Sequence, residues 1–175
     1  MARPTKDELD SAFQEAKHLI WQEKDQYFLA KTLFALHDKY EELNKVLAAC
    51  DSYIRSGFST TAHRGIISAV NAYRNLFSAS NTDFLVNVSD EELNTAVAAA
   101  SRLRESNKDT HQIAKTILNL NYQVKQLESV YRALERFLHS GKATTEQLNL
   151  EKAVKSYRIA ENRAYSSDIS AYGTL

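Results

Sequence analysis

The residue pair best suited to metal chemistry in this sequence is Glu15 and His18. Helical bundles use this Glu-x-x-His spacing in di-iron sites, which need two such motifs and two further Glu, all pointing inward. No second Glu-x-x-His occurs in the chain. On a helical wheel, both side chains point away from the apolar face that Leu9 and Ile20 share. We therefore expect both residues on a solvent-exposed surface, and we expect no metal or other cofactor.

A polar stripe within residues 52–82 has side chains that could read nucleic-acid bases. No Asp or Glu occurs in this segment, and Arg and Asn can each make two hydrogen bonds to a base edge in the major groove. The alternative is an ordinary solvent face, because the segment holds only three Arg and the net charge of the chain is zero. The candidate nucleic-acid-binding residues are Arg55, Arg64, Ser68, Asn71, Arg74 and Asn75.

Aromatic side chains are a third group that could act, through protein recognition. Most of them, such as Phe13, Tyr27 and Phe34, fall on apolar helical stripes, and we expect these in the core. Four others lie near expected element boundaries or opposite an apolar face. Exposed Trp and Tyr are frequent anchors of protein interfaces. The candidate partner-binding residues are Trp21, Phe58, Phe84 and Tyr122.

Motifs of known catalytic chemistry do not occur in this sequence. It contains no Gly-rich phosphate loop, nucleophile elbow or paired-cysteine metal knuckle. Cys50 is the single cysteine and lies at helical spacing from Val46 and Ile54, so we expect a buried structural thiol. We therefore expect that the protein is not an enzyme.

Helices must position these candidate residues, because the residues that break helices are scarce. The chain has four Gly and one Pro, too few for the many tight turns of an all-β fold. The apolar stripe changes sides between Phe28 and Leu36. Residues 5–56 therefore form either two helices with a break near 24–26 or one long helix buried on both sides. We favour the break. There is no repeat of solenoid length.

The strongest pattern in the sequence is a heptad seam spaced by four and three residues. β-Branched residues at position a with Leu at position d favour two-stranded pairing. The partner could be a helix of the same chain or of a second copy, which leaves a homodimer open. The helix after Gly141 is the natural antiparallel partner, because the turn between the two is short. The seam consists of Ile113, Ile117, Leu120, Val124, Leu127, Tyr131, Leu134 and Leu138.

These patterns predict an all-α fold, a five- to six-helix bundle in which a long heptad-patterned helix (about 110–139) packs antiparallel to the C-terminal helix. We expect one helical-bundle domain over residues 1–165 and a flexible C-terminal tail over 166–175. The first ten residues lack the apolar segment of a secretory signal. No apolar run approaches the roughly 20 residues that span a bilayer. We therefore expect a cytoplasmic protein that does not bind membranes.

The expected function is that of a non-enzymatic helical protein-protein interaction module, a small regulatory, adaptor or inhibitor-like protein. Lys and Arg balance Asp and Glu at 22 each, so no overall field attracts the chain to nucleic acid. The expected partner is a protein. The alternative is a DNA- or RNA-associated regulator that uses the acid-free 52–82 segment.

Overall fold

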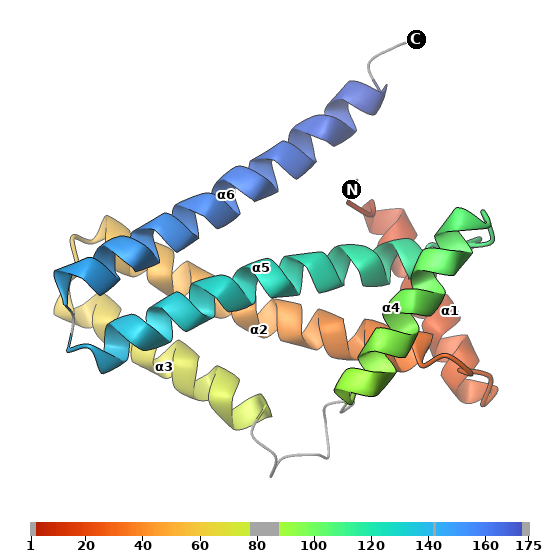
Figure 1. Cartoon of the computed structure of the whole chain (residues 1–175), viewed down its shortest axis with the longest axis horizontal. Coiled ribbons are helices and arrows are strands. Elements are labelled where there is room, and N and C mark those ends of the chain that lie inside the picture. The colour runs from red at the N-terminus through yellow and green to blue at the C-terminus, as the bar shows by residue number, and fades with distance from the viewer. Residues whose placement is uncertain (1–2, 78–87, 142, 173–175) are drawn as a thin grey trace.

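Six helices make up the described part of the chain, which confirms the all-α class (Figure 1). The computed structural model describes the backbone of residues 3–77, 88–141 and 143–172, and the side chains of these ranges except at 77 and 163–172. The helices are α1 (Lys6–Trp21), α2 (Leu29–Arg55), α3 (Thr60–Phe77), α4 (Asp90–Glu105), α5 (Ile113–His139) and α6 (Thr144–Tyr172).

Two predictions about helix ends can be compared with the structure. The break predicted near residues 24–26 is present, because α1 ends at Trp21 and α2 begins at Leu29. The flexible tail predicted over residues 166–175 stays a prediction. The backbone of α6 is helical through Tyr172, and the last three residues lie outside the described part of the chain.

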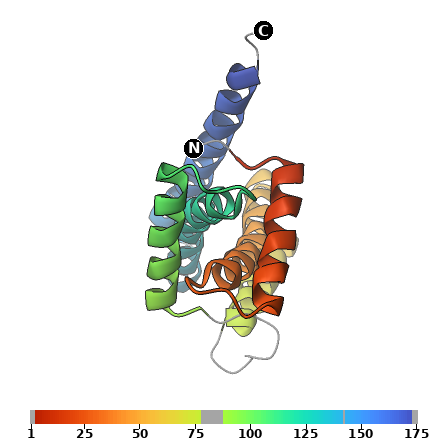
Figure 2. The same ribbon diagram turned by 90° about the vertical axis from the view of Figure 1, so that its right-hand side faces the viewer.

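The heptad seam of α5 is covered by other helices of the same chain. As predicted, α5 packs antiparallel to α6 across the turn at Gly141 (Figure 1). Its most extensive contact is with α2, which runs parallel to it through the centre of the molecule (Figures 1 and 2). A homodimer through the α5 seam would have to displace α2. The seam of α2 has the same spacing and consists of Leu29, Leu33, Leu36, Tyr40, Leu43, Leu47, Cys50 and Ile54.

The second half of the chain repeats the first half with an offset of 84 positions (89 − 5 for the two helix caps). Of the 73 positions from 5 to 77, 22 carry the same residue 84 positions later, as Leu43 and Leu127 do. Both α4 and α5 begin and end 84 residues after α1 and α2, and α6 begins 84 residues after α3. This period exceeds the roughly 20–50 residues of solenoid repeats. The chain is therefore a tandem duplication of a three-helix unit.

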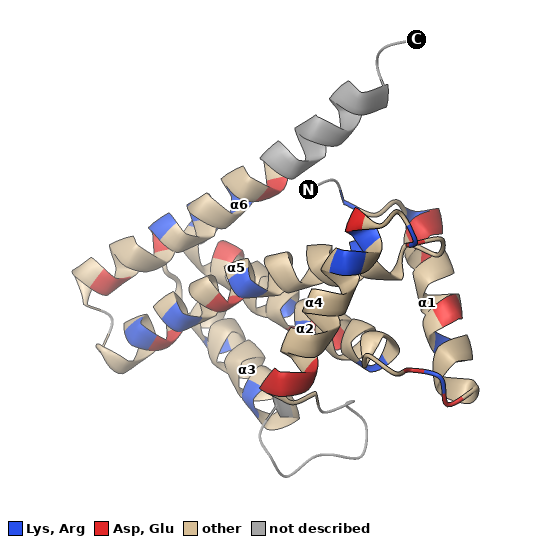
Figure 3. Cartoon of the chain, turned by 45° about the vertical axis from the view of Figure 1, so that its right-hand side comes forward, with Lys and Arg blue, Asp and Glu red and all other residues tan. Residues whose placement is uncertain are grey.

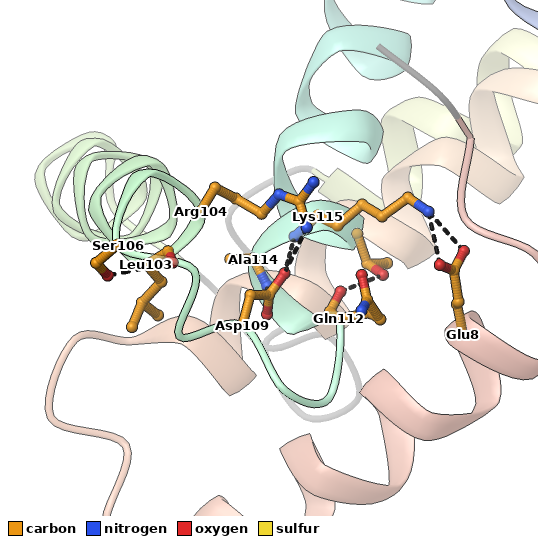
Figure 4. Close-up of polar contacts among 9 residues, drawn as sticks. Glu8, Leu103, Arg104, Ser106, Asp109, Gln112, Ala114 and Lys115 are labelled. Carbon is orange, nitrogen blue, oxygen red and sulfur yellow. Dashed lines mark hydrogen bonds and ion pairs between the residues drawn. The ribbon is translucent and has the colours of Figure 1, made fainter. Parts of the chain in front are cut away.

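The turn before each long helix has the same local structure in both halves. The Asp25 carboxylate accepts hydrogen bonds from the backbone N–H groups of Ala30 and Lys31, both at 3.0 Å. Asp109 caps α5 in the same way, with distances of 2.9 and 2.8 Å (Figure 4). These bonds satisfy N–H groups that the first turn of a helix leaves without partners. One Asp thus sets the start of each long helix.

Two equivalent ion pairs connect the halves at one end of the bundle. Lys31 Nζ lies 2.7 Å from a carboxylate oxygen of Glu92. Lys115 Nζ lies 2.6 Å from a carboxylate oxygen of Glu8 (Figure 4). Each Lys lies in the first turn of a long helix, and each Glu closes the capping box of a short helix in the other half. Each half therefore supplies one Lys and one Glu to the other.

A second reciprocal set lies toward the other end of the bundle. Arg74 of α3 binds Glu135 of α5 at 2.9 Å, and Arg158 of α6 binds Asp51 of α2. All four residues again occupy positions that differ by 84 between the halves. Together with the parallel central helices, these pairs define a pseudo-twofold axis that runs between α2 and α5 along their length.

We predict that acidification weakens the fold partly through Glu8. Burial raises the pKa of Glu8, but hydrogen bonds from Lys115 and Thr5 and the charge of Lys115 leave it below its usual value of 4.5. A lowered pKa stabilises the folded state at pH values above the unfolded pKa, and this contribution is lost as the pH falls through the folded pKa. Urea unfolding, followed by circular dichroism between about pH 7 and pH 3, measures the loss.

The expected result is a smaller fall of the unfolding free energy with pH in Glu8→Gln than in the unsubstituted protein. Lys115→Gln keeps the Glu8 carboxylate but removes its partner, so the unfolding free energy of this variant should also fall less as the pH is lowered. Parallel stability curves for Glu8→Gln and the unsubstituted protein would show that this ion pair does not couple the halves.

Candidate functional site

The duplication separates the residues that the fold needs from those that it does not. Positions in the core match between the halves: Leu33 and Ile117 are both fully buried, and Leu43 and Leu127 are each 1% exposed. The exposed large hydrophobic side chains do not match. Among the described residues, eight large hydrophobic side chains are exposed, and each has a polar or charged equivalent in the other half. The eight are Ile20, Trp21, Tyr27, Phe28, Ile67, Tyr122, Leu148 and Ile159.

Four of these eight side chains belong to the last two residues of α1 and to the connection that follows it, at one corner of the molecule (Figure 1). We call them the aromatic turn: Ile20, Trp21, Tyr27 and Phe28. Trp21 is 82% exposed and Tyr27 is 53% exposed. The equivalent positions, at the end of α4 and in the connection to α5, are Arg104, Glu105, His111 and Gln112. The aromatic character therefore belongs to one half only.

The backbone of the aromatic turn is fixed by hydrogen bonds. The N–H of Lys24 donates to the carbonyl of Leu19 at 2.9 Å, and Asp25 caps α2. Phe28 has a φ of 57°, in the left-handed region, where a bulky residue costs about 1–3 kcal/mol. Gln112 has a φ of 60° at the equivalent position. Both turns therefore require the left-handed conformation at this position, and a polar residue can adopt it as well as an aromatic one.

The structure places the predicted partner-binding residues in different regions. Trp21 is exposed in the aromatic turn, and Tyr122 is 52% exposed on α5. Phe58 is partly buried, because its ring packs 5.1 Å from that of Tyr53. Phe84 lies outside the described residues. Trp21, Phe58 and Tyr122, the three that the structure describes, therefore lie apart from one another.

The sequence prediction missed three members of the aromatic turn, and for Tyr27 it was wrong. We expected Tyr27 in the core because, counted at helical spacing, it falls on the same apolar stripe as Phe13, although we also favoured a break near residues 24–26. The break after Trp21 ends that periodicity, and Tyr27 faces solvent. Comparison of each position with the one 84 residues later would have identified Tyr27, together with Ile20 and Phe28, as a non-matching apolar residue.

The predicted nucleic-acid-binding stripe lies on α3 and at the end of α2. Arg64 and Asn71 are exposed, and so are the other members, Arg55, Ser68, Arg74 and Asn75. The charge of Arg74 is compensated, because its guanidinium donates to Glu135 at 2.9 Å and to the Tyr131 hydroxyl at 3.2 Å. Over the face drawn in Figure 3, Lys and Arg are interspersed with Asp and Glu.

An open cavity of about 340 Å³ lies between α3 and the end of α5. Its polar lining includes His63, His139 and Arg74, and its apolar lining includes Val70 and Leu138. Arg74 is held by Glu135 at the rim. The cavity could receive a small anionic group, but the residues that line it include no carboxylate or thiol that could act as a nucleophile.

Glu15 and His18, which we expected on the surface without a metal, make other contacts. A carboxylate oxygen of Glu15 lies 3.8 Å from Nε2 of His111, in the turn between α4 and α5. The side chains of His18 and Gln22 share a hydrogen bond of 2.6 Å. In the described residues, no three His, Cys, Asp or Glu side chains gather as metal ligands. Cys50 is buried, as predicted, and burial together with the charge of Asp51 raises its pKa to about 12, which keeps the thiol protonated.

Comparisons of the chain with protein-family models, with curated proteins and with solved structures found no match. Across the parts that the structure describes, no helix is both long enough and apolar enough to cross a membrane. Function must therefore be argued from the geometry of the chain and from the differences between its two halves.

We predict that the aromatic turn can be replaced by the residues of the other half without loss of fold. The variant Trp21→Glu/Tyr27→His/Phe28→Gln installs side chains that the same backbone already carries in the second turn. Exposed substitutions change stability by about 0.5 kcal/mol or less each, so the unfolding free energy should stay within about 1.5 kcal/mol of the original. Urea unfolding and circular dichroism measure it. A variant that fails to fold would show that the aromatic side chains serve structure.

Proposed function

We propose that this protein is a non-enzymatic protein-protein interaction module, a regulatory, adaptor or inhibitor-like protein, and that it binds through the aromatic turn. One observation carries the proposal. Two turns with the same backbone differ in that one exposes Ile20, Trp21, Tyr27 and Phe28, whereas the other carries polar and charged residues. Since the equivalent turn adopts the same backbone without such side chains, their exposure to water is best explained by a binding partner.

The physical properties of the aromatic turn suit recognition. Trp and Tyr are the side chains most often found as energetic anchors of interfaces. The backbone is held by the Asp25 cap and by the hydrogen bond from Lys24 to Leu19, so little conformational entropy is lost on binding. Complete burial of Trp21 alone would contribute about 3–5 kcal/mol before the cost of association, at about 25 cal/mol per Å².

Nucleic-acid binding through α3 is the less supported alternative. In its favour, Arg64 and Asn71 are exposed on a helix without acidic residues. Against it, the charge of Arg74 is compensated by Glu135 at 2.9 Å. Phosphate contacts through this face would make binding weaken steeply with salt.

We predict that a photo-crosslinker in the aromatic turn captures a protein. With benzoylphenylalanine at position 21, irradiation in the source cell should yield a discrete higher-mass adduct whose second component mass spectrometry identifies as protein. The same crosslinker at position 105 is the matched control, because Glu105 occupies the equivalent place in the second turn. It should yield less of that adduct by at least about tenfold, as expected for loss of roughly 1.4 kcal/mol or more of binding.

Two outcomes would overturn the proposal. One is an identical pattern of adducts from positions 21 and 105, which would mean that the crosslinks report collision only. The other is an adduct with nucleic acid at position 64 that disappears at high salt, together with no protein adduct at position 21. That result would favour the nucleic-acid alternative.

A further inference from the structure

We propose that the cavity between α3 and the end of α5 binds a small monocarboxylate with an apolar body. This cavity lies toward the end of the bundle opposite the aromatic turn (Figure 1). The site therefore goes beyond the proposed function and does not depend on it. Three observations support it: the shape of the cavity, the chemistry of its lining, and the residues that the other half of the chain has at the same positions.

The cavity exists because α3 lies farther from α5 than its counterpart α6 lies from α2. In the second half, α6 packs against both α5 and α2. In the described residues, the backbone of α3 packs closely against α2 alone, and side chains such as Arg74 bridge the gap to α5. The volume of about 340 Å³ falls at the lower end of the roughly 300–1,000 Å³ of ligand pockets. The cavity therefore suits a small ligand.

The floor of the cavity is apolar, and polar side chains stand among the residues around it. Val70 is 1% exposed, and Leu138 is partly buried against the core. Ile67 also lines the cavity and is 41% exposed, so a ligand that covers it removes apolar surface from water. A mostly apolar wall with a few polar groups is the usual composition of a small-molecule site. The polar lining residues are His63, Asn71, Arg74 and His139.

Arg74 provides the donors that select a carboxylate. A guanidinium has five N–H groups. Nε of Arg74 donates to the Tyr131 hydroxyl at 3.2 Å, and Nη2 donates to Glu135 at 2.9 Å. The edge that Nη1 and Nη2 form together keeps one N–H of each nitrogen without an acceptor among the described residues. Two parallel N–H groups of this kind bind a carboxylate with two hydrogen bonds.

The surroundings of the cavity have an excess of positive charge. Residues 48–77 and 128–147, which gather at this end of the bundle (Figure 1), hold six Lys or Arg and four Asp or Glu, which leaves a net charge of +2. Glu146, at the start of α6, is one of the four acidic residues. The other three are each paired with a cation, which reduces their repulsion of an anion. These pairs are Glu135 with Arg74, Glu128 with Lys39, and Asp51 with Arg158.

The second half has a different lining on equivalent backbone positions. Val154 keeps the buried floor, since it is 5% exposed at the position equivalent to Val70. Glu151 stands in place of Ile67, and it accepts a hydrogen bond at 3.3 Å from Gln147, which stands in place of His63. A carboxylate at this place repels an anion, whereas an isoleucine does not. The first half alone therefore has the residues that suit the ligand.

An NMR titration of the isotope-labelled full chain with phenylacetate tests the proposal. The backbone signals of the lining residues should shift and saturate, with a Kd of about 10 mM or below, as expected for so small a ligand. Phenylacetamide has the same shape without the charge, so it should bind at least about tenfold more weakly, the loss expected when hydrogen bonds to a charged group become neutral. Acetate has the charge without the apolar body and should also bind more weakly than phenylacetate.

The variant His63→Gln/Ile67→Glu tests which residues form the site. It installs the pair that α6 has at the equivalent positions, so α3 should remain folded, which circular dichroism checks. Phenylacetate should bind at least about tenfold more weakly, because a carboxylate then lines the cavity. Gly65→Asn is the matched control. It also installs the residue of the second half, Asn149, on α3 but outside the lining, where a Cβ meets no other atom within 4 Å, so binding should persist.

Four results would overturn this site. These are lining signals that do not shift with phenylacetate, phenylacetamide that binds as tightly as phenylacetate, a folded His63→Gln/Ile67→Glu variant that binds like the unsubstituted protein, or shifts centred on Trp21. The last result would mean that the probe stacks on the exposed aromatic side chains. Because the crosslinking experiment reports on the aromatic turn alone, failure of this site and failure of the proposed function are distinguishable.

Discussion

The parallel contact between α2 and α5 is the constraint on which the rest of the structure depends. Each helix carries an eight-residue apolar seam, too large to leave in water, and the two seams have identical spacing. Their burial against each other fixes the pseudo-twofold axis. The axis in turn explains why Lys31 binds Glu92 and Lys115 binds Glu8. Equivalent buried residues across such an axis must both be apolar enough to pack in the core, whereas equivalent exposed residues are free to differ.

That freedom is what makes the aromatic turn informative. In most proteins an exposed Trp cannot be compared with an equivalent position in the same fold, so it is unknown whether the structure requires it. Here Glu105 occupies the equivalent place on an equivalent backbone. Phe28 and Gln112 share the same left-handed conformation, so the strain belongs to the turn and not to the aromatic ring. The duplication therefore removes the structural explanation for Trp21 and its neighbours, and this supports the binding role proposed for them.

Much of the fold was predictable from sequence, since local patterns determine it. The α5 seam, the capping boxes of Glu8 and Glu92 and the break before α2 follow from periodicity and short-range hydrogen bonding. The pairing of α2 with α5 did not, because Tyr40 and Cys50 interrupt the aliphatic pattern of the α2 seam. Trp21 was found by its position at a helix end. Its neighbours were missed because periodicity alone cannot show where an apolar stripe stops being buried.

Spin-label distances test the equivalence of the two halves most directly. With Cys50 replaced by Leu, the residue at the equivalent position 134, labels at Lys24 and Ser129 define one distance. Labels at Lys108 and Lys45 define its counterpart across the axis, and all four sites are exposed. The pseudo-twofold arrangement predicts that the two distance distributions share the same mean. Clearly different means would contradict it and would remove the reference against which the aromatic turn is judged.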